Sequence, residues 1–360
     1  MGLPQRASLA LALLSSLASA QQVPDGYPAG YAELIRAAEK EGAVTIYSST
    51  DSKSVAGVLQ AFQGRYPKIK VEFVDQSSNE VYTRFTSEFA AGQGTGDLAW
   101  GGADTAVKLI EDGIAAEYTS PETGNLRPGA NYRNAAYSIT YEPIVMIYNK
   151  RLLPAADVPK TRQELTRVLT EKREAYRGKI GTYDVERSAA GIGFLGEDSR
   201  AFPDTAWPLF KAMAQADLKF FTSNGTMVER VASGEIALAY NLAAANIAER
   251  LKTDTTIGMI VPCDYTLYLT RTAIISKKAK HPNAAKVFLD YLLSKEGQQK
   301  LADKSIGSIR TDVQNNPVLQ RPAECKNERA LMPSPERLVV FDPVWRGGFL
   351  KQWKTVLQAK

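Results

Sequence analysis

Apolar positions in the first third of the chain repeat at the spacing of helices, and short apolar runs separate these repeats. Val55, Val58, Leu59 and Phe62 recur at i, i+3, i+4 and i+7, which is the pattern of an amphipathic helix. Similar patterns predict helices over residues 31–41, 81–91 and 105–112, and strands over residues 43–47, 70–74 and 97–100. Strands and helices that alternate at such short intervals are typical of parallel βαβ units in an α/β sheet.

Two long strand-like runs frame the middle of the chain. Residues 137–149, YSITYEPIVMIYN, are interrupted by Pro143, which suits an edge strand or a crossing between lobes. Residues 265–276, YTLYLTRTAIIS, form the second run and precede a helix predicted over residues 282–300. Between the runs, the pattern predicts strands over residues 179–183 and 236–240 and helices over residues 163–176, 189–195, 209–218 and 227–232. One crossing outward and one back predict a second lobe inserted into the first.

Chain length also indicates two lobes, because the roughly 340 residues beyond position 20 exceed what one hydrophobic core usually organises. We assign residues 21–140 and 270–315 to the first lobe, residues 145–265 to the second, and residues 141–144 and 266–269 to hinge crossings. Residues 316–360 are Pro-rich and then aromatic, and we expect this tail to pack on the lobes.

The first twenty residues have the features of a secretory signal peptide. They contain Arg6, an apolar run over residues 9–14 and the small residues 18–20 at a cleavage site. The run is too short to span a bilayer, and the cleavage point has no cysteine to indicate a lipid anchor. We therefore expect residues 1–20 to be removed and the mature chain to reside in the periplasm.

Charge and histidine content argue against several function classes. The chain has 44 Lys and Arg against 39 Asp and Glu, an excess too small and too diffuse for a nucleic-acid surface. His281 is the only histidine, so the usual zinc patterns and histidine-dependent catalytic pairs are missing from the sequence. We expect neither an enzyme nor a cofactor. Cys263 and Cys325 form one disulfide in an oxidising compartment or stay as two buried thiols, and the sequence leaves both readings open.

Polar residues gather at three predicted strand-to-helix turns. The first, SSTDSKS over residues 48–54, has more hydroxyl and carboxylate groups than one helix cap requires. The others are residues 184–188, with Arg187, and residues 222–226, with Thr226. Ligands of α/β sheets bind at the carboxyl ends of strands, where helix N-termini present free amides. Capping accounts for any single turn, but the three together favour an anion site in which residues 48–52 face Arg187 and Thr226 across a cleft.

Several segments together resemble bacterial extracellular solute-binding proteins of ABC importers. They are YEPIVMIYNK over residues 141–150, the turn at residues 233–235 and HPNAAKVFLDYLLSKEGQQKL over residues 281–301. The resemblance covers residues 42–309 and is greatest to the branch of ferric-ion-binding proteins and their relatives for organophosphates and other small anions. It implies a type II-like periplasmic-binding-protein clamshell, which closes on a ligand in the cleft between its lobes and delivers it to permease subunits.

The ferric members of this branch carry iron ligands at positions that this chain fills differently. They have adjacent tyrosines shortly after the Gly-Glu-Ile turn, where this chain has Ala244 and Ala245, and often a histidine where it has Thr50 or Asp51. Iron requires hard oxygen or imidazole ligands, so we expect no metal site. In the alternative, ferric iron held with a synergistic anion, the resemblance implies Tyr240 and Glu142 as ligands.

We predict a monomeric receptor for a small organic anion, phosphorylated or carboxylated. The expected hydrogen-bond donors to the anion are Ser48, Ser49, Thr50, Ser52, Arg187, Ser188, Thr226 and Arg271. We expect Tyr141 and Tyr240 to wall the cleft, and Asp51, Glu142 and Asn241 to bind hydroxyl or amine groups of the ligand. Two further alternatives are a receptor that reports to a membrane sensor kinase and an exported hydrolase, which the single histidine disfavours.

Overall fold

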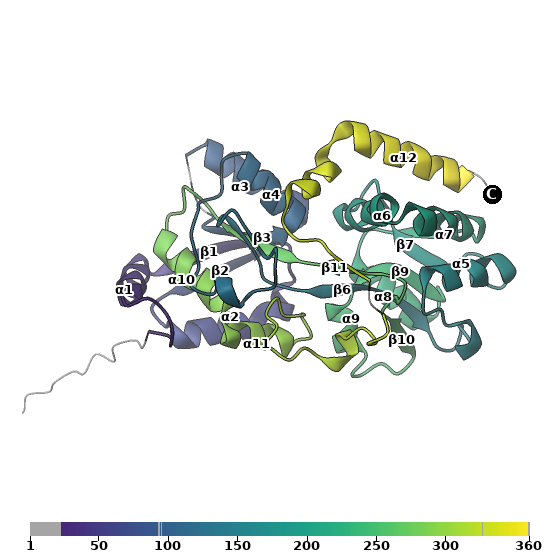
Figure 1. Cartoon of the computed structure of the whole chain (residues 1–360), viewed down its shortest axis with the longest axis horizontal. Helices are drawn as coiled ribbons and strands as arrows, with labels where there is room; N and C mark the ends of the chain where they lie inside the picture. Colours follow the sequence, from purple (N-terminus) through teal and green to yellow (C-terminus); the bar gives the residue numbers. More distant parts are fainter. Residues whose placement is uncertain (1–22, 93, 95, 326, 359–360) are drawn as a thin grey trace, which may run out of the picture.

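Two lobes lie side by side in the computed structural model, which describes residues 23–92, 94, 96–325 and 327–358 (Figure 1). The predicted signal peptide falls outside these residues. Each lobe is built on one mixed β-sheet with helices packed against it. Within the described part of the chain, no helix is both long enough and apolar enough to cross a membrane.

The first lobe contains a six-stranded sheet. Its strands are β1 (Ala43–Ser48), β2 (Lys70–Asp75), β3 (Leu98–Gly102), β4 (Asn131–Tyr132), β5 (Ala136–Ser138) and β12 (Arg271–Ile275), in the order β2-β1-β3-β12-β5-β4. Its helices are α1 (Tyr31–Glu41), α2 (Ser52–Arg65), α3 (Ser78–Ala90), α4 (Ala103–Glu111), α10 (Pro282–Leu293) and α11 (Lys295–Ala302). The parallel pairing of β1 with β2 and with β3 confirms the βαβ prediction, whereas β12 runs antiparallel to β3.

Two apolar cores cover the two faces of this sheet. Val44 and Ile46 pack with α1, α2 and α10, whereas Tyr47 packs with α3 and α4. This division follows from the strand itself, because successive side chains of a strand point to opposite faces. The carboxyl ends of β1 and β3 therefore lead into helices on either side of the sheet and stay free to form a site.

The second lobe contains a seven-stranded sheet. Its strands are β6 (Glu142–Asn149), β7 (Ile180–Tyr183), β8 (Lys219–Phe221), β9 (Leu238–Ala243), β10 (Ile257–Ile260), β11 (Thr266–Leu269) and β13 (Glu328–Ala330), in the order β13-β11-β6-β9-β7-β8 with β10 beside β6. Its helices are α5 (Arg162–Glu171), α6 (Ala189–Ala201), α7 (Pro203–Gln215), α8 (Asn224–Ser233) and α9 (Ala245–Arg250). β7 pairs in parallel with β8 and β9.

Each long strand-like run is divided between the two sheets. The first run gives β5 and β6 and the second gives β11 and β12, so the chain passes between the lobes at residues 139–141 and at Thr270. The expected crossings are residues 141–144 and 266–269, but all of these except Tyr141 lie in strands of the second sheet, where Tyr268 pairs with Pro143. An unbroken apolar run suits a strand of either sheet, so the pattern does not mark the residue at which the sheet changes.

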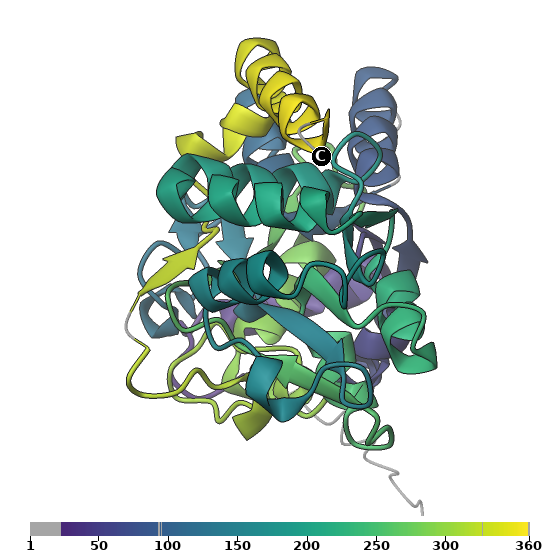
Figure 2. The ribbon, with the colours of Figure 1, turned by 90° about the vertical axis from the view of Figure 1, so that its right-hand side faces the viewer.

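The C-terminal residues contact both lobes. Beyond β13 the chain forms the 3-10 helix η4 (Pro335–Phe341) and the helix α12 (Pro343–Gln358). α12 lies along α7, with the rings of Trp353 and Phe210 5.1 Å apart, and η4 packs against both α4 and α6 (Figures 1 and 2). Cys263 and Cys325 form a disulfide, which ties this tail to the segment between β10 and β11.

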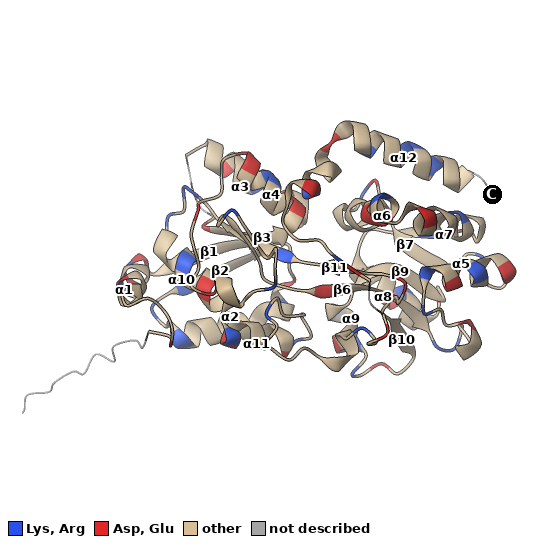
Figure 3. Cartoon of the chain, viewed as in Figure 1, with Lys and Arg blue, Asp and Glu red and all other residues tan. Residues whose placement is uncertain are grey.

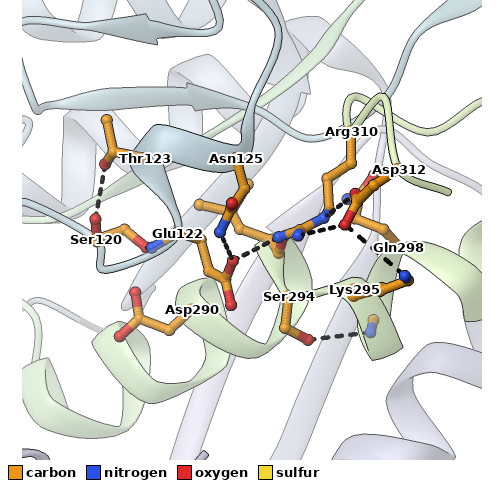
Figure 4. A network of polar contacts seen from close by, with 12 residues as sticks. Ser120, Glu122, Thr123, Asn125, Asp290, Ser294, Lys295, Gln298, Arg310 and Asp312 are labelled. Atoms are coloured by element: carbon orange, nitrogen blue, oxygen red, sulfur yellow. Dashed lines mark hydrogen bonds and ion pairs between the residues drawn. The ribbon is translucent and has the colours of Figure 1, made fainter. Parts of the chain in front are cut away.

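Charged residues of both signs are interspersed over the two lobes (Figure 3). Some of them form a buried network in the first lobe, where Glu122 accepts hydrogen bonds from Arg310 and Asn125 close to Asp290 (Figure 4). The Asp290 carboxylate accepts the hydroxyls of Tyr31 and Tyr118. Burial of this carboxyl group raises the pKa of Asp290 to about 7. The network fastens residues 118–125 to α10.

Candidate ligand-binding cleft

A cavity of about 310 Å³ lies between the lobes. The first lobe contributes Ser49, Asp51, Ser78, Gly101, Gly102, Ala103 and Asp104 to its lining, and the second contributes Tyr183, Ala189, Ala190, Gly193, Phe194, Asn224 and Ala243. The second crossing adds Leu269, Thr270 and Arg271, and the tail adds Leu331, Arg337 and Val340. We refer to this space as the cleft.

Five helices begin at the cleft. In the first lobe α2, α3 and α4 follow the carboxyl ends of β1, β2 and β3, and in the second α6 and α8 follow β7 and β8. Residues at or beside the first position of each helix line the cleft: Asp51, Ser78, Ala103, Ala189 and Asn224. Helix N-termini carry partial positive charge and unpaired amides. The cleft thus lies at the carboxyl ends of strands, where ligands of α/β sheets bind.

In the hydroxyl-rich turn at residues 48–52, some side chains stabilise the turn and the start of α2, and others line the cleft. Ser48 is buried and accepts the Thr50 amide through Oγ at 3.0 Å. Asp51 caps α2 by accepting the amides of Lys53 at 2.7 Å and Ser54 at 3.3 Å. Ser52 is exposed and does not line the cleft. Of the predicted donors in this turn, only Ser49 reaches the cleft lining, together with the carboxylate of Asp51.

Arg271 lies on the floor of the cleft and is held by three contacts. Its Nε donates to Glu142 Oε1 at 2.7 Å, its Nη2 to Glu142 Oε2 at 3.5 Å and its Nη1 to Thr50 Oγ1 at 3.0 Å. Glu142 and Thr50 are buried, whereas one fifth of the Arg271 side chain is exposed. Glu142 and Thr50 therefore position Arg271 and are covered by it.

The two turns of the second lobe face the cleft through other residues than those predicted. Arg187 and Thr226 are exposed and lie outside the lining, and the Thr226 hydroxyl pairs with Ser223 at 2.8 Å. Ser188 caps α6 by accepting the Gly191 amide at 3.3 Å. Asn224 lines the cleft instead, with its Nδ2 donating to the Ala243 carbonyl at 3.0 Å. The expected pairing of residues 48–52 with Arg187 and Thr226 is thus corrected, because Ala189 and Asn224, the first residues of α6 and α8, line the cleft instead.

Tyr141 and Tyr240, expected to wall the cleft, and Asn241, expected to bind polar groups of the ligand, do not belong to its lining. Tyr240 is fully buried in the second lobe, where its hydroxyl donates to Asp198 at 2.8 Å and accepts from Arg162 at 2.6 Å. Asn241 donates to the same Asp198 carboxylate. Burial raises the pKa of the Tyr240 phenol, and the positive charge of Arg162 opposes the rise. These side chains build the core of the second lobe behind the cleft.

Tyr141 serves the crossing rather than the cleft. Its ring stacks on Tyr268 with centroids 4.2 Å apart, and its hydroxyl donates to Glu328 at 3.1 Å. The Arg127 guanidinium lies over the other side of the pair, 4.3 Å from the Tyr141 centroid. Tyr141 thereby joins the first crossing to β11 and to the tail.

Sequence reasoning missed Asp104, Tyr183 and Arg337. Asp104 follows Gly101 and Gly102 at a fourth strand-to-helix turn, a signal of the same kind as the three recognised turns. Burial raises the pKa of the Asp104 carboxyl, and the positive charge of Arg337 opposes the rise. Tyr183 ends β7, and Arg337 comes from the tail, for which no local pattern indicated a site.

The two residues that the resemblance implies as iron ligands each form a hydrogen bond with an arginine side chain. Tyr240 is bound to Arg162 and Glu142 to Arg271. Among the described residues, no group of three or more His, Cys, Asp and Glu side chains is arranged to hold a metal ion. Ala244 and Ala245 are buried and offer no ligand atoms in their side chains.

A two-lobed α/β fold with a cavity between its lobes defines a clamshell ligand-binding protein. The chain belongs to the family of bacterial extracellular solute-binding proteins, whose model matches residues 57–327. It is therefore a substrate-binding protein of an ABC transporter and not an enzyme, which confirms the resemblance seen in the sequence.

Solved structures agree with this assignment. The substrate-binding protein of an ABC transporter from Agrobacterium tumefaciens is 31% identical, with a TM-score of 0.80 over 88% of this chain and 94% of that one. The fold also matches AfuA from Actinobacillus pleuropneumoniae with fructose-6-phosphate bound, at 19% identity and a TM-score of 0.70 over 88% and 99% of the two chains. Iron-bound HitA from Pseudomonas aeruginosa is 19% identical, with a TM-score of 0.69 over 87% and 99%.

Proposed function

We propose that this chain is a periplasmic receptor that captures a small organic anion, phosphorylated or carboxylated, as a monomer and delivers it to the permease of an ABC importer. The observation that carries the proposal is the meeting of five helix N-termini and two arginines, Arg271 and Arg337, at one cleft. Both features favour negative charge, and neither is expected at a site for a neutral or cationic solute.

Arg271 supports the proposal through the donors that it keeps. Its contacts with Glu142 and Thr50 use one N–H of each nitrogen, so Nη1 and Nη2 each retain a second N–H. A hydrogen bond from such a group to an anion contributes about 1.5–3 kcal/mol. The Glu142 carboxylate offsets the charge of Arg271 and fixes its orientation, so the ligand meets a preorganised donor.

The rest of the lining indicates the body of the ligand. Asp51, Asp104 and the Oδ1 atom of Asn224 are acceptors, and Asn224 Oδ1 is buried with no hydrogen-bond partner among the described residues. Such acceptors suit ligand hydroxyl or amine groups. Phe194, Leu269, Leu331 and Val340 provide an apolar wall. A volume of about 310 Å³ fits a small ligand, since it lies at the lower end of ligand pockets. An organic anion with polar groups on its body satisfies all these features.

The ligands of structural relatives give two directions to test. AfuA has bound fructose-6-phosphate and HitA has bound iron. The first is a phosphorylated, hydroxyl-rich molecule and matches the proposed ligand class. The second requires ligand atoms that the described residues around this cleft do not group together.

A thermal-shift screen of the purified mature chain tests the proposal. The panel contains hexose phosphates, glycerol phosphates, phosphonates, di- and tricarboxylates, their neutral counterparts and ferric citrate. Because a ligand that binds only the native state raises the unfolding temperature, we expect a shift with at least one metal-free organic anion. A shift with neutral solutes alone, or only with iron and with a visible charge-transfer band, contradicts the proposal. Turnover of ester substrates would contradict it as well.

A further inference from the structure

The tail supplies a third wall of the cleft. Leu331, Arg337 and Val340 come from the residues between β13 and α12, far from both lobes in sequence. This segment is fastened mainly to the second lobe, because β13 pairs with β11, η4 packs against α6 and α12 packs against α7. The segment also contacts the first lobe, where η4 packs on α4 and the Phe341 ring lies 6.4 Å from that of Tyr82. The Arg337 side chain itself is tied to the second lobe by its hydrogen bond to Glu197 of α6.

Arg337 belongs to a cluster of arginine and carboxylate side chains. Glu197 of α6 accepts hydrogen bonds from Arg329 at 2.8 Å, Arg200 at 3.0 Å and Arg337 at 3.3 Å. Glu336 is the second carboxylate of the cluster and pairs with Arg329 at 2.6 Å and with Arg200 at 3.1 Å. Three guanidinium groups thus share these two carboxylates, and the Asp104 carboxyl group, which also lines the cleft, interacts electrostatically with Arg337. Of the three arginines, Arg337 is the one that lines the cleft.

Arg337 also retains an unused donor. Its side chain is 8% exposed, and its Nε is buried without a hydrogen-bond partner in the part of the chain that the structure describes. A buried donor without a partner destabilises a structure by about 1–3 kcal/mol, so such atoms are rare and indicate a missing partner. Nε itself is covered, so it is the rest of the Arg337 side chain that lines the cleft.

We propose that Arg337 binds the anionic group of the ligand, so that the C-terminal segment is part of the binding site and determines its preference for anions. This inference rests on the proposed function, because it assigns a residue to the anion. Arg337, which Glu197 of the second lobe holds, and Arg271, on β12 of the first lobe, line the same cleft. The anion then lies between cations that belong to opposite lobes.

Isothermal titration calorimetry of three variants tests this assignment. Arg337→Gln removes the charge and the Nε donor, Arg337→Lys keeps the charge alone, and Arg329→Gln alters the same Glu197 cluster outside the cleft. The probes are fructose 6-phosphate, citrate and any stronger anion from the panel, each beside its neutral counterpart. We expect Arg337→Gln to weaken anion binding about 10- to 100-fold, the range for a charged hydrogen bond. Arg337→Lys should lose less, and Arg329→Gln should bind like the wild type.

The outcomes separate the two proposals. If Arg337→Gln and Arg329→Gln weaken anion binding equally, the cluster has a structural role and the inference is overturned. Unchanged anion binding by Arg337→Gln overturns it as well. Equal losses for an anion and its neutral counterpart overturn it too. If Arg337→Gln does not fold, the affinity of Arg337→Lys for the anion tests the inference. A wild-type affinity of Arg337→Lys would then contradict it. If the wild type binds no anion of the panel, the proposed function fails and this inference fails with it.

Discussion

Arg271 and Glu142 form an ion pair that joins the two lobes where the chain passes between them. Arg271 is the first residue of β12 in the first sheet, and Glu142 is the first residue of β6 in the second. The Nε–Oε1 distance is 2.7 Å, and Glu142 is fully buried. Both strands begin at a crossing, so the pair lies at the hinge and at the floor of the cleft. Stability of the hinge and recognition of the ligand therefore depend on the same guanidinium.

Substitution of this pair separates stability from binding. Arg271→Met leaves the Glu142 carboxylate buried without its partner, so we expect the free energy of unfolding to fall by about 3 kcal/mol and anion binding to be lost. The double variant Arg271→Met/Glu142→Gln removes the buried charge, and we expect most of the stability, but not the binding, to return. Urea unfolding followed by circular dichroism measures the first effect and calorimetry the second. A double variant as unstable as the single one contradicts this account.

The second lobe allows a matched comparison between residues inside and outside the cleft. Asn224 lines the cleft with an unpartnered Oδ1, whereas Arg187 and Thr226 are exposed outside the lining. We expect Asn224→Ala to weaken binding of the panel anion about fivefold to tenfold, the effect of one lost neutral hydrogen bond. Arg187→Ala and Thr226→Ala should bind like the wild type in the same titration. A loss of affinity confined to Arg187→Ala would restore the original sequence prediction.

Asp290 makes the stability of the first lobe depend on pH. Burial raises the pKa of Asp290 from 3.8 to about 7, so the folded chain holds this proton more tightly than the unfolded chain. Between about pH 4 and pH 7 the unfolded carboxyl ionises first, and the stabilisation, complete below pH 4, declines as the pH rises.

Asp290→Asn retains an acceptor for the Tyr31 and Tyr118 hydroxyls but does not titrate. Between pH 4.5 and pH 8 we expect the wild type to lose about 2–4 kcal/mol of unfolding free energy relative to this variant. Chemical denaturation at a series of pH values measures it. A difference that is constant over this range would show that Asp290 does not titrate abnormally.

The disulfide between Cys263 and Cys325 closes a loop with a sequence separation of 62 residues. We expect Cys263→Ala/Cys325→Ala to lower the free energy of unfolding by about 2–4 kcal/mol, because the cross-link restricts the unfolded chain. Reduction of the wild type should give the same loss, and reductant should leave the double variant unchanged. Thiol titration under denaturing, non-reducing conditions checks the bridge itself, and two reactive thiols in that assay would rule it out.

Local patterns were sufficient for most of the elements. The helix over residues 31–41 and the parallel strands around β1 follow from periodicities that tertiary contacts reinforce. The strand changes at Thr270 and after β5 did not follow, because the apolar run continues through the crossing. The helix α12 was also missed, since its rings pack on α7 and its pattern has meaning only beside that partner.

The sequence predicted where the candidate site lies better than it predicted which side chains line it. Turns after β1, β7 and β8 do lead to the cleft, as the carboxyl ends of strands in such sheets should. Which side chains point inward depends on helix phase and on distant partners. A hydrogen bond to Glu142 orients Arg271, and a hydrogen bond to Asp198 holds the Tyr240 side chain in the core. Arg337 reaches the cleft from the tail, a long-range contact that no local spacing encodes.

The most direct test of the central claim is a pair of titrations by calorimetry, with the strongest organic anion of the panel and with its neutral counterpart. We predict one-to-one binding of the anion and at least hundredfold weaker binding of the neutral compound, because two charged hydrogen bonds are lost with the anionic group. Equal affinities for the two compounds would contradict an anion-binding cleft.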